Sequence, residues 1–164
     1  MIDFKDKREA ALWHAINDDV MGGRSQGEIV FKNGLCVFSG DISLENNGGF
    51  SSVFKHIEPL SQKIDRLTID VIGDGLTYQL RVITYVDGYR LAYKHHFATS
   101  SNKLERFVFL LKDFIPSFRG RIIDNAPELK AENIQQIGLL VKNNTEGPFS
   151  LRLCKLDAKP MIEG

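Results

Sequence analysis

The stretch RLTIDVIGDGLTYQLRVITYVDGYRLAYKHHF, residues 66–97, decides the fold class of this chain. Its first segment places Leu67, Ile69 and Val71 at every second position, with charged or hydroxyl-bearing residues between them. A period of two is typical of a β-strand that buries one face. The same alternation recurs in two later segments, 78–86 and 90–97. The stretch therefore predicts three successive strands.

Short turn sequences separate the predicted strands. Lys-Asn-Gly at 32–34 and Val-Asp-Gly at 86–88 are typical of tight hairpins, because Asn-Gly and Asp-Gly tolerate positive φ angles. Gly-Asp-Gly at 73–75 is expected to do the same between two long strands. Strands joined by short turns, without long helices between them, favour an antiparallel sandwich or barrel over a parallel sheet.

The rest of the chain shows the same period. Strands are expected at 106–111 and 149–156, with shorter ones at 28–31, 35–40 and 50–55. Helix is expected to be minor, with good local propensity only at 6–12 and at 126–134, where Pro127 stands near the start. No repeat or linker divides the 164 residues, so we expect a single β domain over residues 1–164.

The composition narrows the classes of partner. Lys plus Arg and Asp plus Glu both total 21, so the formal net charge is zero and nucleic acid is not an expected partner. No apolar run approaches the roughly 18 residues that span a bilayer. The N-terminus lacks an apolar signal segment, which predicts a cytoplasmic protein. The eleven Phe residues are expected mainly in the core.

Cys36 and Cys154 are the two cysteines, and they lie far apart in the chain. No Cys/His spacing of a zinc site is present, so no zinc is predicted. A reducing cytoplasm would keep both thiols free, and their apolar strand settings predict inert side chains. The first and last strands of such a fold can be neighbours, so the sequence leaves open whether the two thiols lie close together.

Five motifs appear in order along the chain: INDDVMGGRSQG at 16–27, FSGDISLENNGGFSSV at 38–53, GDG at 73–75 followed by Tyr78, FRGR at 118–121 after Phe114 and Pro116, and GPFSL at 147–151. In this order they resemble the motifs of the complex I intermediate-associated protein family, named for its thirty-kilodalton founding member. The resemblance runs from about Trp13 to Leu156. Three positions depart from the family pattern: Phe54 replaces a usual Arg, Leu104 a usual Trp and Leu110 a usual Pro.

The resemblance implies a galactose-binding-like jelly roll, a β-sandwich also used by many carbohydrate-binding modules. Eukaryotic members of the family are mitochondrial assembly factors for NADH:ubiquinone oxidoreductase, respiratory complex I, and are not subunits of the finished enzyme. This chain is accordingly expected to hold a partly assembled protein client, as a chaperone-like binding domain with no chemical step. The alternative is a domain like a carbohydrate-binding module, which takes a small sugar ligand.

The loop Asn17–Gly27 is the first candidate binding segment. The carboxylates of Asp18 and Asp19 suit hydrogen bonds to sugar hydroxyls or coordination of a hard cation, and Arg24 is the most outward-looking member. The alternative is structural, because Asn and Asp stabilise turns and a Gly pair permits unusual backbone angles. Loops on β-sandwiches often carry function, so a binding role stays open beside the turn.

A second loop, residues 43–50, resembles the first in composition. Glu45, Asn46 and Asn47 would complete an oxygen cage with Asp18 or Asp19. Ca²⁺ takes about 6–8 such oxygens, and jelly-roll modules related in fold often hold a structural calcium. The spacing of an EF-hand is absent, so no metal site or cofactor is predicted, and calcium stays an alternative.

Arg119 and Arg121 lie on the same side of an extended segment, with Gly120 between them. Paired guanidinium groups suit carboxylates or phosphates, because each offers a planar fork of donors. The alternative is that one Arg pairs with an internal acid such as Asp18 or Asp19. In that case the first loop would be a structural clasp.

Other residue groups favour structural roles. His95 and His96 are strand neighbours that point to opposite faces, so they are not expected to share a metal. Tyr85, Tyr89 and Tyr93 flank a hairpin and either form an aromatic platform for a sugar ring or pack across the strands. No GxSxG, HExxH, P-loop or GxGxxG motif is present, so no enzyme activity is predicted. The expected contact surface has three parts: the loop 17–27, the loop 45–49 and the Arg119/Arg121 strand.

Overall fold

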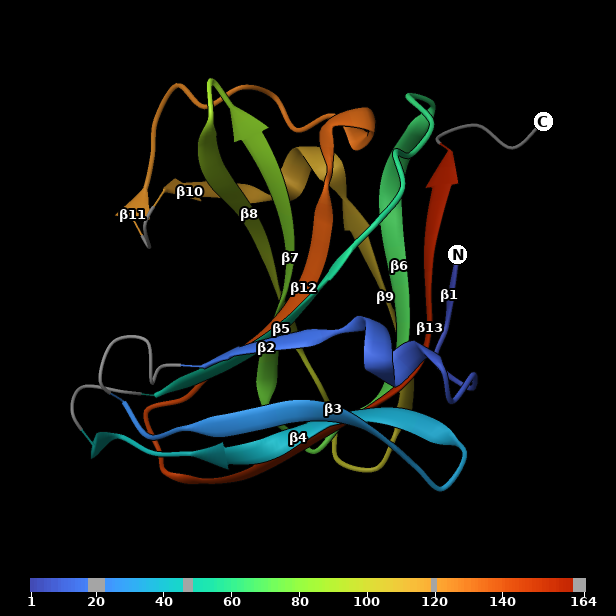
Figure 1. Cartoon of the computed structure of the whole chain (residues 1–164), viewed down its shortest axis with the longest axis vertical. Coiled ribbons are helices and arrows are strands. Elements are labelled where there is room, and N and C mark those ends of the chain that lie inside the picture. The colour runs from blue at the N-terminus through green and yellow to red at the C-terminus, as the bar shows by residue number, and fades with distance from the viewer. Residues whose placement is uncertain (18–22, 46–48, 119–120, 161–164) are drawn as a thin grey trace.

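The computed structural model describes residues 1–17, 23–45, 49–118 and 121–160. Two antiparallel sheets pack against each other as a β-sandwich (Figure 1). The first is a six-stranded sheet of β1 (Ile2–Asp3), β3 (Gln26–Lys32), β4 (Leu35–Ile42), β6 (Ile64–Ile72), β9 (Leu104–Leu110) and β13 (Gly147–Pro160). The second is a seven-stranded sheet of β2 (His14–Asn17), β5 (Phe50–His56), β7 (Thr77–Val86), β8 (Tyr89–Ala98), β10 (Ile115–Phe118), β11 (Arg121–Ile122) and β12 (Gln136–Lys142).

The strand order within each sheet is far from the order along the chain. The six-stranded sheet runs β3-β4-β13-β6-β9, with β1 paired to β13, and the seven-stranded sheet runs β11-β10-β8-β7-β12-β5-β2. Ile2 lies opposite Leu156, so the first and last strands are neighbours. This architecture confirms the predicted antiparallel sandwich of the jelly-roll type, and the barrel alternative is not adopted.

Alternate residues of the long strands fill the space between the sheets. Leu67, Ile69 and Val71 are all 0% exposed, which confirms the period of two in that strand. Most of the phenylalanines are buried as expected: Phe4, Phe38, Phe54, Phe97, Phe109, Phe114 and Phe149. Each large apolar side chain that is fully buried stabilises the fold by roughly 1.5–3 kcal/mol.

Two of the predicted turns are tight hairpins. Asn33 and Gly34 join β3 to β4 with φ angles of 52° and 85°. Asp87 and Gly88 join β7 to β8 with φ angles of 51° and 81°. Both pairs therefore occupy the left-handed region that Asn-Gly and Asp-Gly tolerate.

The predicted hairpin turn at Gly-Asp-Gly, residues 73–75, is wrong. The segment 73–75 joins β6 to β7, and these strands belong to different sheets, so it crosses from one sheet to the other. Its centre is Asp74, whose carboxylate accepts hydrogen bonds from the backbone N–H of Leu76 (3.1 Å), the Tyr78 hydroxyl (3.0 Å) and the backbone N–H of Ser150 (2.8 Å). Burial, followed by the nearby Asp74 carboxylate, raises the pKa of Tyr78. These bonds tie the crossing to both sheets.

Helix is minor, as expected, and limited to short 3-10 turns. Within the described residues these are η1 (Glu9–Leu12), η4 (Leu111–Asp113) and η5 (Ala131–Asn133). The predicted helix at 126–134 is wrong over its first half, because the Tyr93 hydroxyl binds the carbonyl of Pro127 (2.6 Å) and Leu129 is buried in the core. Packing across the end of the sandwich outweighs local helix propensity there.

Candidate functional site

A polar groove of about 680 Å³ lies at the start of β3 and the end of β4 and includes Asn17, the last residue of β2. Two glycines shape it, because Gly27 and Gly40 face each other across β3 and β4. A Cβ atom on Gly27 would lie 2.2 Å from Ser51 Oγ, and one on Gly40 would lie 1.9 Å from the Gln26 carbonyl oxygen. Only glycine permits this close approach. The lining residues are Asn17, Gly23, Arg24, Ser25, Gln26, Gly27, Glu28, Ser39, Gly40 and Asp41.

Arg24, which lines the groove, pairs with Glu45 of the second predicted loop, a residue outside the groove lining. Arg24 Nε lies 3.2 Å from Glu45 Oε2, and the two side chains are 69% and 61% exposed. An ion pair this exposed contributes little to stability, because water screens both charges. Both groups are therefore free to exchange their mutual contact for a contact with a ligand.

The described ends of the first loop also carry the structural role that was the alternative. The Ser51 hydroxyl donates to Asn17 Oδ1, and Asn17 Nδ2 donates to the Gly27 carbonyl (3.4 Å). The Ser25 hydroxyl binds both the carbonyl (3.1 Å) and the N–H (2.9 Å) of Ser43. These bonds anchor the loop bases to the sandwich and leave Arg24 pointing outward.

Five predicted site residues lie outside the described part of the chain: Asp18, Asp19, Asn46, Asn47 and Arg119. The oxygen cage and the Arg119 pairing therefore stay predictions. Glu45 is the described member of that cage, and its carboxylate is paired with Arg24. Across the described residues, no group of three His, Cys, Asp or Glu side chains gathers where it could hold a metal ion.

Arg121 does not join the groove. It lies in β11, at one edge of the seven-stranded sheet, whereas Asn17 ends β2 at the other edge. Six strand spacings of about 4.8 Å separate these edges, or roughly 29 Å along the sheet. The three parts of the expected contact surface therefore do not form one continuous site.

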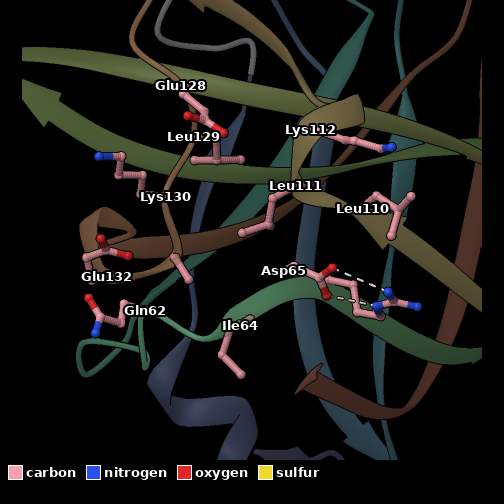
Figure 2. A pocket seen from close by; sticks show the side chains of 12 residues that line it. Gln62, Ile64, Asp65, Leu110, Leu111, Lys112, Glu128, Leu129, Lys130 and Glu132 are labelled. Carbon is pink, nitrogen blue, oxygen red and sulfur yellow. Dashed lines mark hydrogen bonds and ion pairs between the residues drawn. The ribbon is translucent and has the colours of Figure 1, made fainter. Parts of the chain in front are cut away.

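A second groove was not anticipated from the sequence (Figure 2). It has a volume of about 500 Å³ and lies between the start of β6, the turn η4 and residues 128–132. Leu111 and Leu129 are buried in its floor. Its charged residues are of both signs: Asp65, Glu128 and Glu132 against Arg66, Lys112 and Lys130. The expectation of a helix over 126–134 concealed it, because an extended segment forms one wall.

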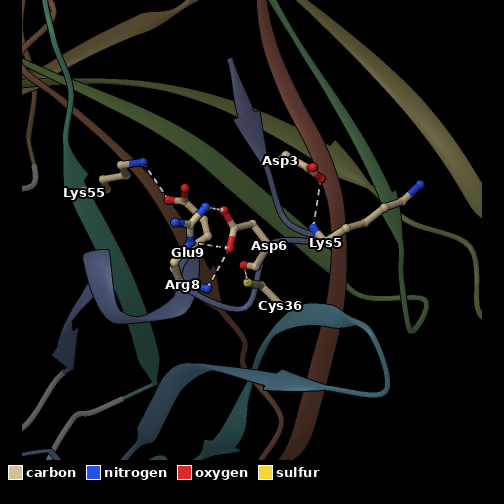
Figure 3. Close-up of polar contacts among 7 residues, drawn as sticks. All are labelled: Asp3, Lys5, Asp6, Arg8, Glu9, Cys36 and Lys55. Carbon is tan, nitrogen blue, oxygen red and sulfur yellow. Dashed lines mark hydrogen bonds and ion pairs between the residues drawn. The ribbon is translucent and has the colours of Figure 1, made fainter.

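A buried polar cluster fastens η1 to β5. Glu9 accepts hydrogen bonds from Lys55 Nζ (2.6 Å) and from the Trp13 indole N–H (3.0 Å), and Figure 3 shows the Lys55 contact. Glu9 is only 9% exposed. Each donor has its acceptor, so the cluster stabilises the fold and leaves no free group for chemistry.

The two cysteines do not pair. Cys36 lies opposite Leu153, not Cys154, so the thiols of the neighbouring strands point to opposite faces, and both are free. Burial raises the pKa of the Cys36 thiol to about 11, and burial also raises the pKa of Cys154. Both shifts agree with the expectation of inert thiols.

The histidines and tyrosines behave mainly as packing residues. His95 lies edge-on to Phe109, with ring centroids 4.9 Å apart, whereas His96 is on the outer face, as predicted for strand neighbours. Tyr93 is only 3% exposed, so it cannot join Tyr85 and Tyr89 in an aromatic platform. The cross-strand packing alternative holds for Tyr93.

Sequence reasoning also missed a basic surface on the outer side of the seven-stranded sheet. Arg81 and Lys94 lie directly opposite each other there, on β7 and β8. The signal was present in the sequence, because both residues fall on the polar phase of the period-two pattern. Their convergence depends on which strands are neighbours.

The fold is shared with solved structures of other proteins. The family 11 carbohydrate-binding module of a cellulosomal cellulase of Clostridium thermocellum is similar with a TM-score of 0.68 and 12% identity, covering 93% of this chain and 89% of that one. A family 30 carbohydrate-binding module of a cellulosomal cellulase from the same organism gives 0.61 and 12%, covering 93% of each chain. An exo-beta-agarase gives 0.57 and 12%, but only 26% of that chain is covered, against 99% of this one. At these identities the likeness concerns the fold alone.

Within the described residues, no helix has the length and apolar character that crossing a bilayer requires.

Two further comparisons concern the sequence. No curated protein matches the chain. The family model described as Complex I intermediate-associated protein 30 matches residues 2–153, from β1 into β13. That match spans both sheets and confirms the resemblance carried by the five sequence motifs, so the chain belongs to the complex I intermediate-associated protein 30 family.

Proposed function

We propose that this chain is a non-enzymatic binding domain that contacts a protein client during assembly of NADH:ubiquinone oxidoreductase, respiratory complex I. The observation that carries the proposal is the family match, which spans residues 2–153 and so includes both sheets. The family is described by its association with intermediates of complex I. A client of this chain would therefore be a subunit or subassembly of that complex.

The polar groove lined by Arg24, together with the Glu45 side chain that pairs with Arg24, is the proposed contact site. Arg24 and Glu45 are exposed and bind each other, so a client that presents an acid and a base can replace the pair without leaving either charge unmatched. Glu28 and Asp41 add acceptors along the groove. Polar contacts of this kind are typical of the rim of a protein–protein interface, where they fix orientation.

The test is affinity capture from the soluble and membrane fractions of the native host, read by mass spectrometry. We expect the wild type to enrich subunits of complex I and an Arg24→Ala, Glu45→Ala variant to lose them. A matched variant, Arg106→Ala, Asp70→Ala, removes another exposed ion pair on the six-stranded sheet and should retain them. Capture without any complex I subunit overturns the proposed function. Equal capture by the wild type and the groove variant overturns the groove as the contact site.

A second candidate is the binding of a neutral sugar in the same groove. It is favoured by the hydroxyl, amide and carboxylate side chains of Ser39, Gln26 and Asp41, which suit sugar hydroxyls. The fold is also that of two proteins described as carbohydrate-binding modules. The described lining holds no aromatic ring on which a sugar could stack, so protein contact ranks first.

Thermal melting distinguishes the two candidates. A ligand at 100 times its dissociation constant stabilises the fold by about 2.7 kcal/mol, which corresponds to a shift of several degrees. A panel of neutral oligosaccharides, with and without Ca²⁺, should leave the melting temperature unchanged if protein contact is the function. A shift that is lost in the Arg24→Ala, Glu45→Ala variant would instead support sugar binding.

A further inference from the structure

The seven-stranded sheet carries an unbalanced set of positive charges. Its strands contain no Asp or Glu, although acidic and basic residues are equal in number, at 21 each, in the whole chain. Because Leu80, Val82 and Tyr93 face the core, Arg81 and Lys94 point outward. We call the outer side of this sheet the basic face; its cations are Arg81, Arg90, Lys94 and Lys142, with His14, His56 and His96 nearby in the register.

Like charges are held against each other at the centre of the basic face. Arg81 and Lys94 are register partners, and like charges directly opposite on paired strands are destabilising. Burial, followed by the charges of Arg81 and Lys142, lowers the pKa of Lys94. Burial and the charge of Arg90 lower the pKa of Arg81. The fold therefore tolerates a local repulsion that a bound anion would relieve.

Among the residues that the structure describes, no carboxylate forms an ion pair that offsets this repulsion. Arg81 Nε donates to Gln79 Oε1 at 3.0 Å, a neutral partner. None of the ion pairs among the described residues involves Arg81, Arg90, Lys94 or Lys142. Other strand cations do have acids, as Lys55 has Glu9 and Arg106 has Asp70. What distinguishes the basic face is that several cations without an ion-pair partner in the described part of the chain gather on one side of one sheet.

An apolar floor lies beneath the charges. Phe54, Ile83 and Ala92 form a buried cluster on the same side, at 3%, 0% and 6% exposure. The Phe54 ring covers Gly138, where a Cβ atom would come within 2.3 Å of it. The Arg90 guanidinium carbon lies 5.3 Å from the centre of that ring. A stacked guanidinium keeps its edges free for carboxylates, and a floor of low polarity strengthens such contacts.

The spacing of the cations selects the kind of anion. Arg81 lies opposite Gly138, and Lys142 is four residues further along β12, which is roughly 13 Å at about 3.3 Å per residue. This backbone separation is several times the width of a single carboxylate or phosphate. An extended peptide places alternate side chains about 6.6 Å apart, so two such steps match the span. A sugar finds no open ring at the centre of the face, because Phe54 is 3% exposed.

We propose that the basic face binds an acidic protein segment, an extended peptide with Asp or Glu at alternate positions. This surface is distinct from the polar groove lined by Arg24, and the inference rests on the proposed function only in taking a protein as the partner. The peptide's carboxylates would pair with Arg81, Lys94 and Lys142, and its alternate side chains would point away from the sheet, as the period of two in an extended chain requires.

The test is fluorescence anisotropy with the purified full chain and a labelled short peptide in which glutamate alternates with valine. We expect binding that weakens as NaCl is raised, because salt screens exposed charges. An Arg81→Gln, Lys94→Gln variant should bind at least about tenfold more weakly, since hydrogen bonds to charged groups are involved. The variant should melt no lower than the wild type, because it removes a repulsion. A matched variant, Lys32→Gln, Arg152→Gln, removes two exposed cations from the six-stranded sheet and should bind like the wild type.

Four results would overturn the proposal. The first is equal binding of the wild type to a peptide with glutamine in place of glutamate. The second is equal binding of the glutamate peptide by the wild type and the Arg81→Gln, Lys94→Gln variant. Displacement of the peptide by millimolar inorganic phosphate would identify a small-anion site instead. Heparin binding as tightly as the peptide would identify a general polyanion surface. The assay uses no complex I protein, so its outcome is independent of the capture experiment.

Discussion

Removing the Glu9 side chain should destabilise the N-terminal part of the fold. Its carboxylate serves two donors at once, the Lys55 ammonium at 2.6 Å (Figure 3) and the Trp13 indole N–H at 3.0 Å. The side chains of Lys55 and Glu9 are only 17% and 11% exposed. Glu9→Ala would leave an ammonium and an indole N–H without their partner in a place that water reaches poorly.

The size of the effect follows from these contacts. Removing one partner of a buried ion pair costs about 3–5 kcal/mol, and an unsatisfied buried donor about 1–3 kcal/mol. Both groups retain some exposure, so the lower part of the range applies, and we expect Glu9→Ala to lower the free energy of unfolding by about 3 kcal/mol. In a chain of this size that corresponds to a melting temperature lower by roughly 6–12 °C.

Urea unfolding measures this loss, followed both by the fluorescence of the single tryptophan, Trp13, and by far-ultraviolet circular dichroism. Lys55→Met in the Glu9→Ala background should recover part of the loss, with a coupling energy of at least about 1 kcal/mol. The matched control is Glu58→Ala, at an exposed position, which should stay within about 0.5 kcal/mol of the wild type. A cost below about 1 kcal/mol for Glu9→Ala, or strict additivity with Lys55→Met, would refute the reasoning.

Three further outcomes are expected from the contacts described above. Asp74→Ala should destabilise the fold by about 2–4 kcal/mol in the same urea assay, because it leaves the buried Tyr78 hydroxyl without its acceptor; a loss below about 0.5 kcal/mol would contradict this. The hydrogen bond to Arg106 lowers the pKa of Asp70. The ionised Asp70 therefore stabilises the fold above about pH 4, and this contribution is lost as the pH falls below that value. Between about pH 5 and pH 3 the free energy of unfolding should fall less steeply for Asp70→Asn than for the wild type, and parallel curves would contradict this. Because Cys36 is 0% exposed and its pKa is raised to about 11, iodoacetamide at pH 8 should modify Cys154 first and Cys36 only on unfolding, as peptide mass spectrometry would show; early modification of Cys36 would count against its burial.

Some features of the candidate site could be predicted from short stretches of sequence, and others depend on how distant segments come together. Arg24 and Glu45 were both expected to belong to a binding surface, and the structure pairs them across two loops. Arg121 was expected beside them, yet it lies at the far edge of the seven-stranded sheet. The composition of the loops identified polar residues. The distances between residues of different loops depend on the path of the whole chain, and a short sequence pattern does not predict that path.

The sequence by itself determined most of the long strands, their buried faces and the two hairpins, but it did not predict β12 (Gln136–Lys142), whose nearly continuous burial lacks the period of two. A strand's pleat alternates side chains between faces, so the spacing of Leu67, Ile69 and Val71 fixes which face is buried. Asn-Gly and Asp-Gly fix the hairpins because few other residues accept positive φ. The five motifs in order also sufficed to indicate the family. All of this information lies within short stretches of chain.

Only the tertiary structure decided which strands share a sheet. The strand order β11-β10-β8-β7-β12-β5-β2 places residues from distant parts of the chain side by side, and the crossing at 73–75 sends β6 and β7 to different sheets. The basic face emerges from that division, because a chain with balanced charge has one sheet without acidic residues. Sheet membership depends on how all the apolar faces pack together, and that long-range packing leaves no trace in the alternation of any single strand.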